Sequence, residues 1–284
     1  MKLLNRKFAL WIITYPVVLS APFHNVPAMD IQAQEGIQFF LEKKYCIAKG
    51  NVRIKQGETT IFCQKIKIFF KSASLSKSPE IERIVAIGQA VVHRGANELR
   101  ADRLVFYVKD QKLLAQSCFN LGVSLFQRER GVAMQTKELQ YDLNSQEGVA
   151  TQGAQLNHPK GWLRSDTICF SFSKKSPQPL KVFAGLENLN KDSKFLVQAK
   201  GNVKMMYEDW KIISKEAFYD EAEEKLQLLG AVQVANGKEN FGTTQRAVLD
   251  LKKRCYRIQA LEKRSCVLMI PAHQTLSLKK IKRK

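Results

Sequence analysis

The side chains in this chain that are able to do chemistry are scattered. None of the four histidines has a nucleophile or a metal-ligand partner nearby in sequence: His24, His93, His158 and His273. The chain contains no G-x-S-x-G, Walker loop, H-E-x-x-H or G-x-G-x-x-G motif. Asp102 and Asp166 recur at matching positions of a repeat, which favours turn or strand-edge residues over a catalytic pair. The sequence therefore predicts a protein that is not an enzyme and uses no metal or cofactor.

The cysteines are also far apart. They include no C-x-x-C pair, which argues against a zinc ribbon or a thioredoxin-like motif: Cys46, Cys63, Cys118, Cys169, Cys255 and Cys266. Cys255 and Cys266 would face each other if a hairpin turned near Ala260-Leu261. This pair is the candidate disulfide, and the alternative is that both are core residues.

The charge of the chain is strongly positive. It has 46 Lys and Arg against 26 Asp and Glu, a formal net charge of +20. Such a charge favours anionic partners, whether nucleic acid, phospholipid head groups or the phosphates of a lipid. The last six residues, 279–284, are mostly basic, and we expect them to form a disordered tail that touches an anionic membrane surface.

The opening segment has the composition of a secretory signal. Three basic residues precede a short apolar stretch, and Val26-Pro27-Ala28 supplies small residues for cleavage. The apolar run is interrupted by Tyr15-Pro16 and is shorter than the roughly 20 residues of a membrane-spanning helix. We therefore expect residues 1–28 to be cleaved and the mature chain to be exported. An uncleaved membrane anchor is the alternative.

An internal repeat dominates the rest of the chain. One block places a glycine before two alternating apolar residues, and it begins at Gly50, Gly88, Gly201 and Gly230. A second block places polar residues before another alternating pair, and it ends at Ile68, Phe106, Tyr141, Phe170, Tyr219 and Leu249. Both blocks have a period of two, which is the signature of a strand with one buried face. A further unit at Gly153 blurs this alternation and predicts an edge or a bend.

The repeat is itself duplicated. Ile37 and Phe39 match Leu139 and Tyr141 at an offset of 102 residues, whereas later blocks match at 113. About eleven extra residues therefore lie within 173–193, a Ser, Lys, Asn and Pro-rich stretch that predicts an exposed loop, like its shorter counterpart at 71–82. We divide the chain into a signal (1–28), a first half (29–131), a second half (132–262) and a basic tail (263–284).

These patterns predict an all-β protein built from short antiparallel strands. No long helix is indicated, and residues 220–225 are interpreted as a turn despite their helical composition. Strands with one apolar and one polar face must bury the apolar faces against each other, in a sandwich, jelly roll or barrel. A repeat that stacks in one direction also leaves an open edge at each end.

Ordered motifs in the first half resemble a known family. Residues 45–58 contain Cys46-Ile47-Ala48-Lys49-Gly50-Asn51-Val52 and then Gln56-Gly57-Glu58, and residues 98–107 read ELRADRLVFY. Together they resemble the OstA-type repeat of the lipopolysaccharide transport protein A family, and the pattern begins again at Gln198-Ala199-Lys200-Gly201. The resemblance covers residues 30–260. It implies a repetitive, twisted β-jelly roll in the periplasm, which binds lipopolysaccharide and bridges the inner and outer membranes. Its apolar groove would shield the acyl chains of lipid A.

The resemblance also implies residue roles and partners. The inward positions of the repeat are the candidate lipid-binding groove: Ile54, Ile66, Ile68, Leu104, Phe106, Leu139, Tyr141, Ile168, Phe170 and Tyr219. Taken alone, each of these residues is equally explained as a side chain that only fills the hydrophobic core. The weaker phosphate-binding candidates are Arg53, Lys55, Arg100 and Arg103. The partners would be lipopolysaccharide and LptC-like and LptD-like jelly-roll proteins, joined by edge-strand pairing, together with head-to-tail copies of this chain.

Three alternatives remain open at this point. The first is an LptC-like subunit of the same pathway, anchored in the inner membrane. The second is a nucleic-acid-binding protein, but aromatic residues do not interleave with basic runs and the export signal argues against it, so we expect no nucleic acid. The third is a repetitive structural or adhesive surface protein.

Overall fold

The computed structural model describes residues 29–71, 80–118, 122–172, 195–237, 239–253 and 255–258. These residues form seventeen strands and one short 3₁₀ helix, η1 (Arg128–Arg130). The first nine strands are β1 (Met29–Gln32), β2 (Ile37–Phe40), β3 (Tyr45–Gln56), β4 (Thr59–Phe70), β5 (Ile81–Arg94), β6 (Asn97–Tyr107), β7 (Lys112–Gln116), β8 (Val123–Gln127) and β9 (Val132–Thr136). The others are β10 (Glu138–Asp142), β11 (Glu147–His158), β12 (Gly161–Ser171), β13 (Leu196–Tyr207), β14 (Trp210–Asp220), β15 (Lys225–Asn236), β16 (Glu239–Asp250) and β17 (Cys255–Ile258).

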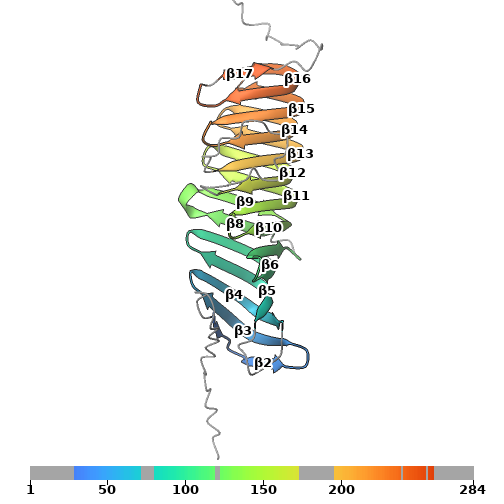
Figure 1. Ribbon diagram of the computed structural model, residues 1–284. Helices are drawn as coiled ribbons and strands as arrows, with labels where there is room; N and C mark the ends of the chain where they lie inside the picture. Colours follow the sequence, from blue (N-terminus) through green and yellow to red (C-terminus); the bar gives the residue numbers. More distant parts are fainter. Residues whose placement is uncertain are drawn as a thin grey trace, which may run out of the picture.

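All seventeen strands belong to one antiparallel sheet. Figure 1 shows them stacked along one long axis, with β2 near one end and β17 at the other. The predicted all-β, repetitive antiparallel fold is confirmed. Among the described residues, no helix is long and apolar enough to cross a membrane.

Each long strand bends near its middle. The ladder between neighbouring strands shifts register there, for example between Lys49 and Val52 of β3. At five of these bends two consecutive residues have positive φ, and one of the two is always glycine: Gly50-Asn51, Gly88-Gln89, Gln152-Gly153, Gly201-Asn202 and Gly230-Ala231. A bulge of this kind bends the strand sharply, so the two halves of each of these strands run in different directions. The predicted bend at Gly153 is therefore confirmed, with the glycine in the second position.

Positive φ is one reason for glycine at these bends, and lack of room for a side chain is a second reason at several of them. A side chain from the preceding corner packs against the missing Cβ position: Gln64 at Gly88, Asp166 at Gly201 and Lys215 at Gly230. At Gly201 the Asp166 carboxylate also accepts a hydrogen bond from Asn202 Nδ2 at 2.9 Å. In three of the six second blocks of the sequence repeat, the polar residue that opens the block is thus the neighbour of a corner glycine.

The bends divide the sheet into two arms. Arm A contains β2, β7, β10 and β17, together with the halves of the long strands that pair with them or with one another in the same row. Arm B contains β1, β8 and β9, together with the other halves of the long strands. β6 shows the division directly, because its residues 103–107 pair with β7 and its residues 97–100 pair with β8. The two arms then rejoin at β11, which pairs with β10 and with β9.

The inner faces of both arms share one core. A single cluster of buried apolar residues runs from Met29 to Leu249 and passes without a break from the first predicted half to the second. The duplication is visible in the strand bounds, since β3 and β11 begin 102 residues apart and β6 and β14 begin 113 residues apart. The division at residue 131 stays a prediction.

The smaller predictions have mixed outcomes. Residues 221–224 form a turn between β14 and β15, as expected. The signal at 1–28, the predicted loop at 173–193 and the basic tail at 263–284 lie outside the described residues. So do residues 72–79 of the predicted loop 71–82, whose last two residues belong to β5.

The corner geometry predicts a difference between two glycine substitutions. Gly95 has a φ of +55° in a hairpin, and nothing lies within 4 Å of the position that an alanine methyl group would take there. Gly201 has a φ of +77° and has Asp166 beside it. Both changes to alanine incur the backbone cost of positive φ, about 1 kcal/mol. Gly201→Ala should lower the free energy of unfolding by roughly 1 kcal/mol more, from crowding. Urea denaturation of the two variants measures this, and equal midpoints would show that the corner has room.

Candidate functional site

The deepest layer of arm A is a row of alternating large and small residues. Direct cross-strand pairs join its members from one end of the sheet to the other. In spatial order they are Ile37, Ala48, Ile66, Ala86, Leu104, Ala115, Leu139, Ala150, Ile168, Ala199, Ala217, Leu228 and Ala247. The alternation is interrupted once, where Ala199 pairs with Ala217. Large residues beside small ones fill the narrow space next to the corners without strain. This layer is closed packing and not a channel.

The next layer of arm A lies nearer the open side of the fold and has larger side chains. Its members, again joined by direct pairs, are Phe39, Cys46, Ile68, Ile84, Phe106, Leu113, Tyr141, Gly148, Phe170, Val197, Tyr219, Leu226 and Leu249. The facing layer of arm B is aliphatic: Ile31, Ile54, Ile61, Val92, Leu99, Leu125, Met134, Leu156, Leu163, Met205, Ile212 and Val234. These two layers line the space between the arms, except at the end of the stack, where Phe39 is exposed.

All ten predicted groove residues belong to these three layers. Nine of them are buried: Ile54, Ile66, Ile68, Leu104, Phe106, Leu139, Tyr141, Ile168 and Phe170. Tyr219 is partly buried and packs against the same core. Ile66, Leu104, Leu139 and Ile168 lie in the deepest layer, whereas the other six lie nearer the open side. Whether any of them contacts a lipid stays a prediction.

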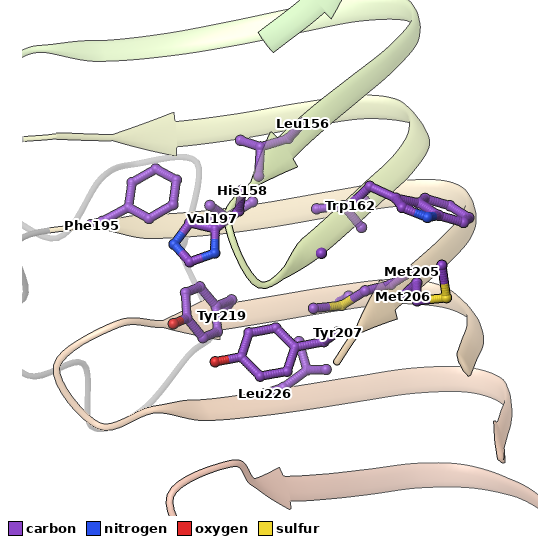
Figure 2. Close-up of a pocket in the computed structure, with 13 residues that line it drawn as sticks. Leu156, His158, Trp162, Phe195, Val197, Met205, Met206, Tyr207, Tyr219 and Leu226 are labelled. Carbon is purple, nitrogen blue, oxygen red and sulfur yellow. The ribbon is translucent and has the colours of Figure 1, made fainter. Parts of the chain in front are cut away.

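Between the arms in the second half lies an apolar pocket, shown in Figure 2. Leu156, Leu163 and Met205 line it from arm B, and Val197 and Tyr219 line it from arm A. Its open space is only about 30 Å³, which is room for about one water molecule. The side chains therefore fill this part of the interior, and an acyl chain that enters here has to displace them or separate the arms.

A chain of aromatic rings follows the open side of this pocket. Ring centroids lie 6.0 Å apart for Tyr141 and Phe170, 5.1 Å for Phe170 and Phe172, and 5.1 Å for Phe172 and Phe195. Tyr219 continues the chain at 6.5 Å from Phe195. Figure 2 shows Phe195, His158, Tyr219 and Tyr207 gathered along one side of the pocket. Rings in such contact give a continuous, adaptable apolar surface.

Contacts between hairpin tips close the fold opposite the corners. We call this gap between the tips of the two arms the mouth. From arm B, Arg94 Nη1 donates to the carbonyl of Leu143 at 3.3 Å, and Arg130 Nη1 lies 2.9 Å from Glu221 Oε2. Lys160 Nζ lies 4.0 Å from Glu224 Oε1. Each cation of arm B meets a group of arm A several strands further along the stack, because the sheet twists.

The mouth also contains a more polar cavity in the first half, of about 270 Å³. Leu99, Leu125 and Tyr141 form part of its apolar lining, whereas Arg94 and Gln127 are polar. Burial raises the pKa of Tyr141 to about 12, so its hydroxyl stays protonated at neutral pH. The mouth is thus apolar in depth and polar at its tips.

The predicted phosphate-binding residues lie elsewhere. Arg53, Lys55, Arg100 and Arg103 are exposed on the outer face of the sheet. Arg100 Nε donates a hydrogen bond to Glu98 Oε1, and this bond is the main cause that holds the pKa of Glu98 below its usual value. The cations at the mouth are Arg94, Arg130 and Lys160. Sequence reasoning missed them because they lie in or beside turns, outside the period-two pattern.

The cysteines form no reactive pair among the residues described. Cys46 and Cys63 are buried on the inner faces of β3 and β4, and burial raises the pKa of each thiol to about 11. Such thiols are largely unreactive. Cys255 begins β17, but Cys266 lies outside the described residues, so the candidate disulfide stays a prediction.

These features define an all-β protein with a bent sheet and a continuous apolar interior. Residues 30–147, less than half of the chain, match the family described as LptA/(LptD N-terminal domain) LPS transport protein. A solved structure of LptH, the LptA homologous periplasmic component of the lipopolysaccharide transport device of Pseudomonas aeruginosa, aligns with a TM-score of 0.39 and 10% identity. It covers 63% of this chain and 94% of that chain. No curated protein matches the sequence.

The alternating row predicts that stability depends on the summed side-chain volume of two paired residues and not on which of the two is the larger. Ile168 and Ala199 are direct cross-strand partners and both are fully buried. Ile168→Ala should cost about 2 to 5 kcal/mol by leaving a cavity, and Ala199→Ile about 1 to 3 kcal/mol by overpacking. The double variant should lose clearly less than the sum, because the total volume is restored. Denaturation of all four proteins checks this, and simple additivity would mean that the row is not tightly packed.

The pocket also predicts a pH effect. Burial lowers the pKa of His158 below its ordinary value near 6.5, although the nearby Glu221 carboxylate acts in the opposite direction. The unfolded chain therefore takes up a proton at this residue before the folded chain does, so stability falls as the pH drops below about 6.5. The melting temperature of the wild type should fall more between pH 7.5 and 5.5 than that of His158→Gln. Equal falls would mean that His158 does not contribute.

Proposed function

We propose that this chain is a non-enzymatic carrier that binds lipopolysaccharide and moves it across the periplasm, with the lipid A acyl chains held between the two arms. The observation that supports this best is the single apolar core, which runs along the whole stack from Met29 to Leu249. The sequence match of residues 30–147 to a lipopolysaccharide transport family agrees with this role.

The energetics of the proposed role need no catalytic group. Each CH₂ kept from water is worth about 0.8 kcal/mol, but an acyl chain that leaves one apolar environment for another gains little. Movement along the carrier is therefore a relay between sites of similar affinity. The driving force comes from outside the chain, from a partner that extracts the lipid at the expense of ATP.

The open edges of the sheet are the proposed contacts with partners. Among the described strands β2 pairs only with β3, and β17 pairs only with β16. Unpaired edges of this kind bind another strand through main-chain hydrogen bonds. We infer that LptC-like and LptD-like jelly-roll proteins, or further copies of this chain, extend the sheet and join its apolar interior to theirs.

Two versions of the proposal differ in whether the chain is anchored in the inner membrane or released from it by cleavage. The matched family includes the N-terminal domain of LptD as well as LptA, and an LptC-like subunit would keep its N-terminus as an inner-membrane anchor. Mass spectrometry of the chain isolated from cells distinguishes anchoring from cleavage, because a cleaved chain lacks residues 1–28.

Photo-crosslinking in cells tests lipid binding directly. A photoreactive residue replaces Phe106, which faces inward on β6 and is 5% exposed, and in the control it replaces the adjacent Tyr107, which faces outward and is 38% exposed. We expect a lipopolysaccharide adduct at position 106 and little at 107. Position 170 on β12 repeats the test in the second half.

Failure of this test has a clear meaning. If the folded, exported protein gives no adduct at 106 or 170, or equal adducts at 106 and 107, the arms do not hold lipid. A structural or adhesive role for the β-repeat would then be the better interpretation.

A further inference from the structure

Two charge pairs bridge the mouth above the apolar pocket of the second half. Arg130 and Glu221 are only 17% and 35% exposed at their side chains, so their pair is partly shielded from water. Lys160 and Glu224 form the second, more exposed pair. In both pairs the cation lies on a hairpin tip of arm B and the carboxylate lies on the single turn 221–224 of arm A. The two arms are thus tied together by opposite charges.

Both cations lie beside aromatic rings that line the pocket. The Arg130 guanidinium carbon lies 5.8 Å from the centroid of Phe195, and Lys160 Nζ lies 5.7 Å from the centroid of Tyr207. Phe195 and Tyr207 are both part of the pocket wall. The positive charges therefore lie at the rim of an apolar pocket, which is the arrangement that suits an amphiphile with an anionic head and a hydrocarbon tail.

The acidic residues occupy the position that such a head group would take. Arginine binds carboxylate and phosphate with the same planar set of donors, so Glu221 and a phosphate compete for one site. While the carboxylates hold Arg130 and Lys160, the tips stay together and the pocket keeps its 30 Å³ of open space. Releasing them frees two cations and removes the tie between the arms in one step.

We propose that Arg130 and Lys160 form a binding site for the anionic head group of a lipid, and that Glu221 and Glu224 are internal competitors that keep the mouth shut until the lipid arrives. The proposal rests on the proposed function and adds the head-group site to it. The anion is a phosphate-type group attached to acyl chains, whose tails enter the pocket below Phe195 as the arms separate. Free phosphate alone lacks the tails and should bind only weakly.

The test is equilibrium binding of fluorescently labelled lipopolysaccharide to the purified full chain. Glu221→Gln/Glu224→Gln removes both competitors with little change of shape and should bind about 3- to 10-fold more tightly, as expected for the loss of two partly exposed ion pairs. Arg130→Met/Lys160→Met should bind more weakly than wild type. Glu223→Gln is the matched control, because Glu223 lies on the same turn but pairs with Lys225 of its own arm. It should bind as wild type does.

Competition experiments identify the source of the anion. Inorganic phosphate and the deacylated saccharide phosphate should displace labelled lipopolysaccharide poorly, whereas intact lipid A should displace it fully. Displacement by inorganic phosphate at similar concentration would overturn the lipid assignment, because the site would then be a simple anion site. Circular dichroism melts of every variant confirm that the β fold is kept, and Lys160→Met alone serves if the double cation variant does not fold.

The outcomes separate the two proposals. If wild type binds no lipopolysaccharide, the carrier function fails and the head-group site fails with it. If wild type binds and the Glu221→Gln/Glu224→Gln protein matches Glu223→Gln, the internal competition is wrong while the carrier function stands. Unchanged binding by the Arg130→Met/Lys160→Met protein would likewise remove the head-group site alone.

Discussion

The bend in every long strand is the constraint on which the rest of this structure depends. A flat sheet of this length would expose one apolar face to water, and a second sheet would be needed to cover it. Here the long strands bend together, and in β3, β5, β11, β13 and β15 the bend is a bulge with positive φ, so one sheet supplies both faces of its own core. The turn requires glycine where a neighbouring side chain such as Asp166 packs against the backbone. The repeat in the sequence is the repeat of this bend.

The inward and outward faces of the strands could be predicted from the sequence, because alternation with period two fixes which side chains point inward. Ile66, Phe106 and Ile168 were assigned to the inner face in this way, and all are buried. The glycine blocks were visible too, but their meaning as corners was not, because a glycine before an alternating pair also fits a simple turn. Only the φ angles and the register shift at Gly88 and Gly201 show the difference.

The mouth could not be predicted, because its contacts depend on how far the sheet twists between distant strands. Arg130 meets Glu221 across 91 residues, and Arg94 meets Leu143 across 49. No offset of the repeat gives these pairs. The basic residues chosen from the sequence, such as Arg53 and Arg103, lie on regular strand positions and so point outward, whereas the cations at the mouth lie in or near turns.

The different strengths of the contacts within and between the arms decide how such a fold can open. Each arm is held by continuous main-chain ladders, whose hydrogen bonds are costly to break inside a protein. The arms contact each other through apolar side chains and a few polar contacts at the tips. Separating them exposes apolar surface at about 25 cal/mol per Å², but an acyl chain placed between them covers that surface again. Under the proposed function, a rotation at the corners after release of the tip contacts would open the interior to lipid without breaking a strand pair.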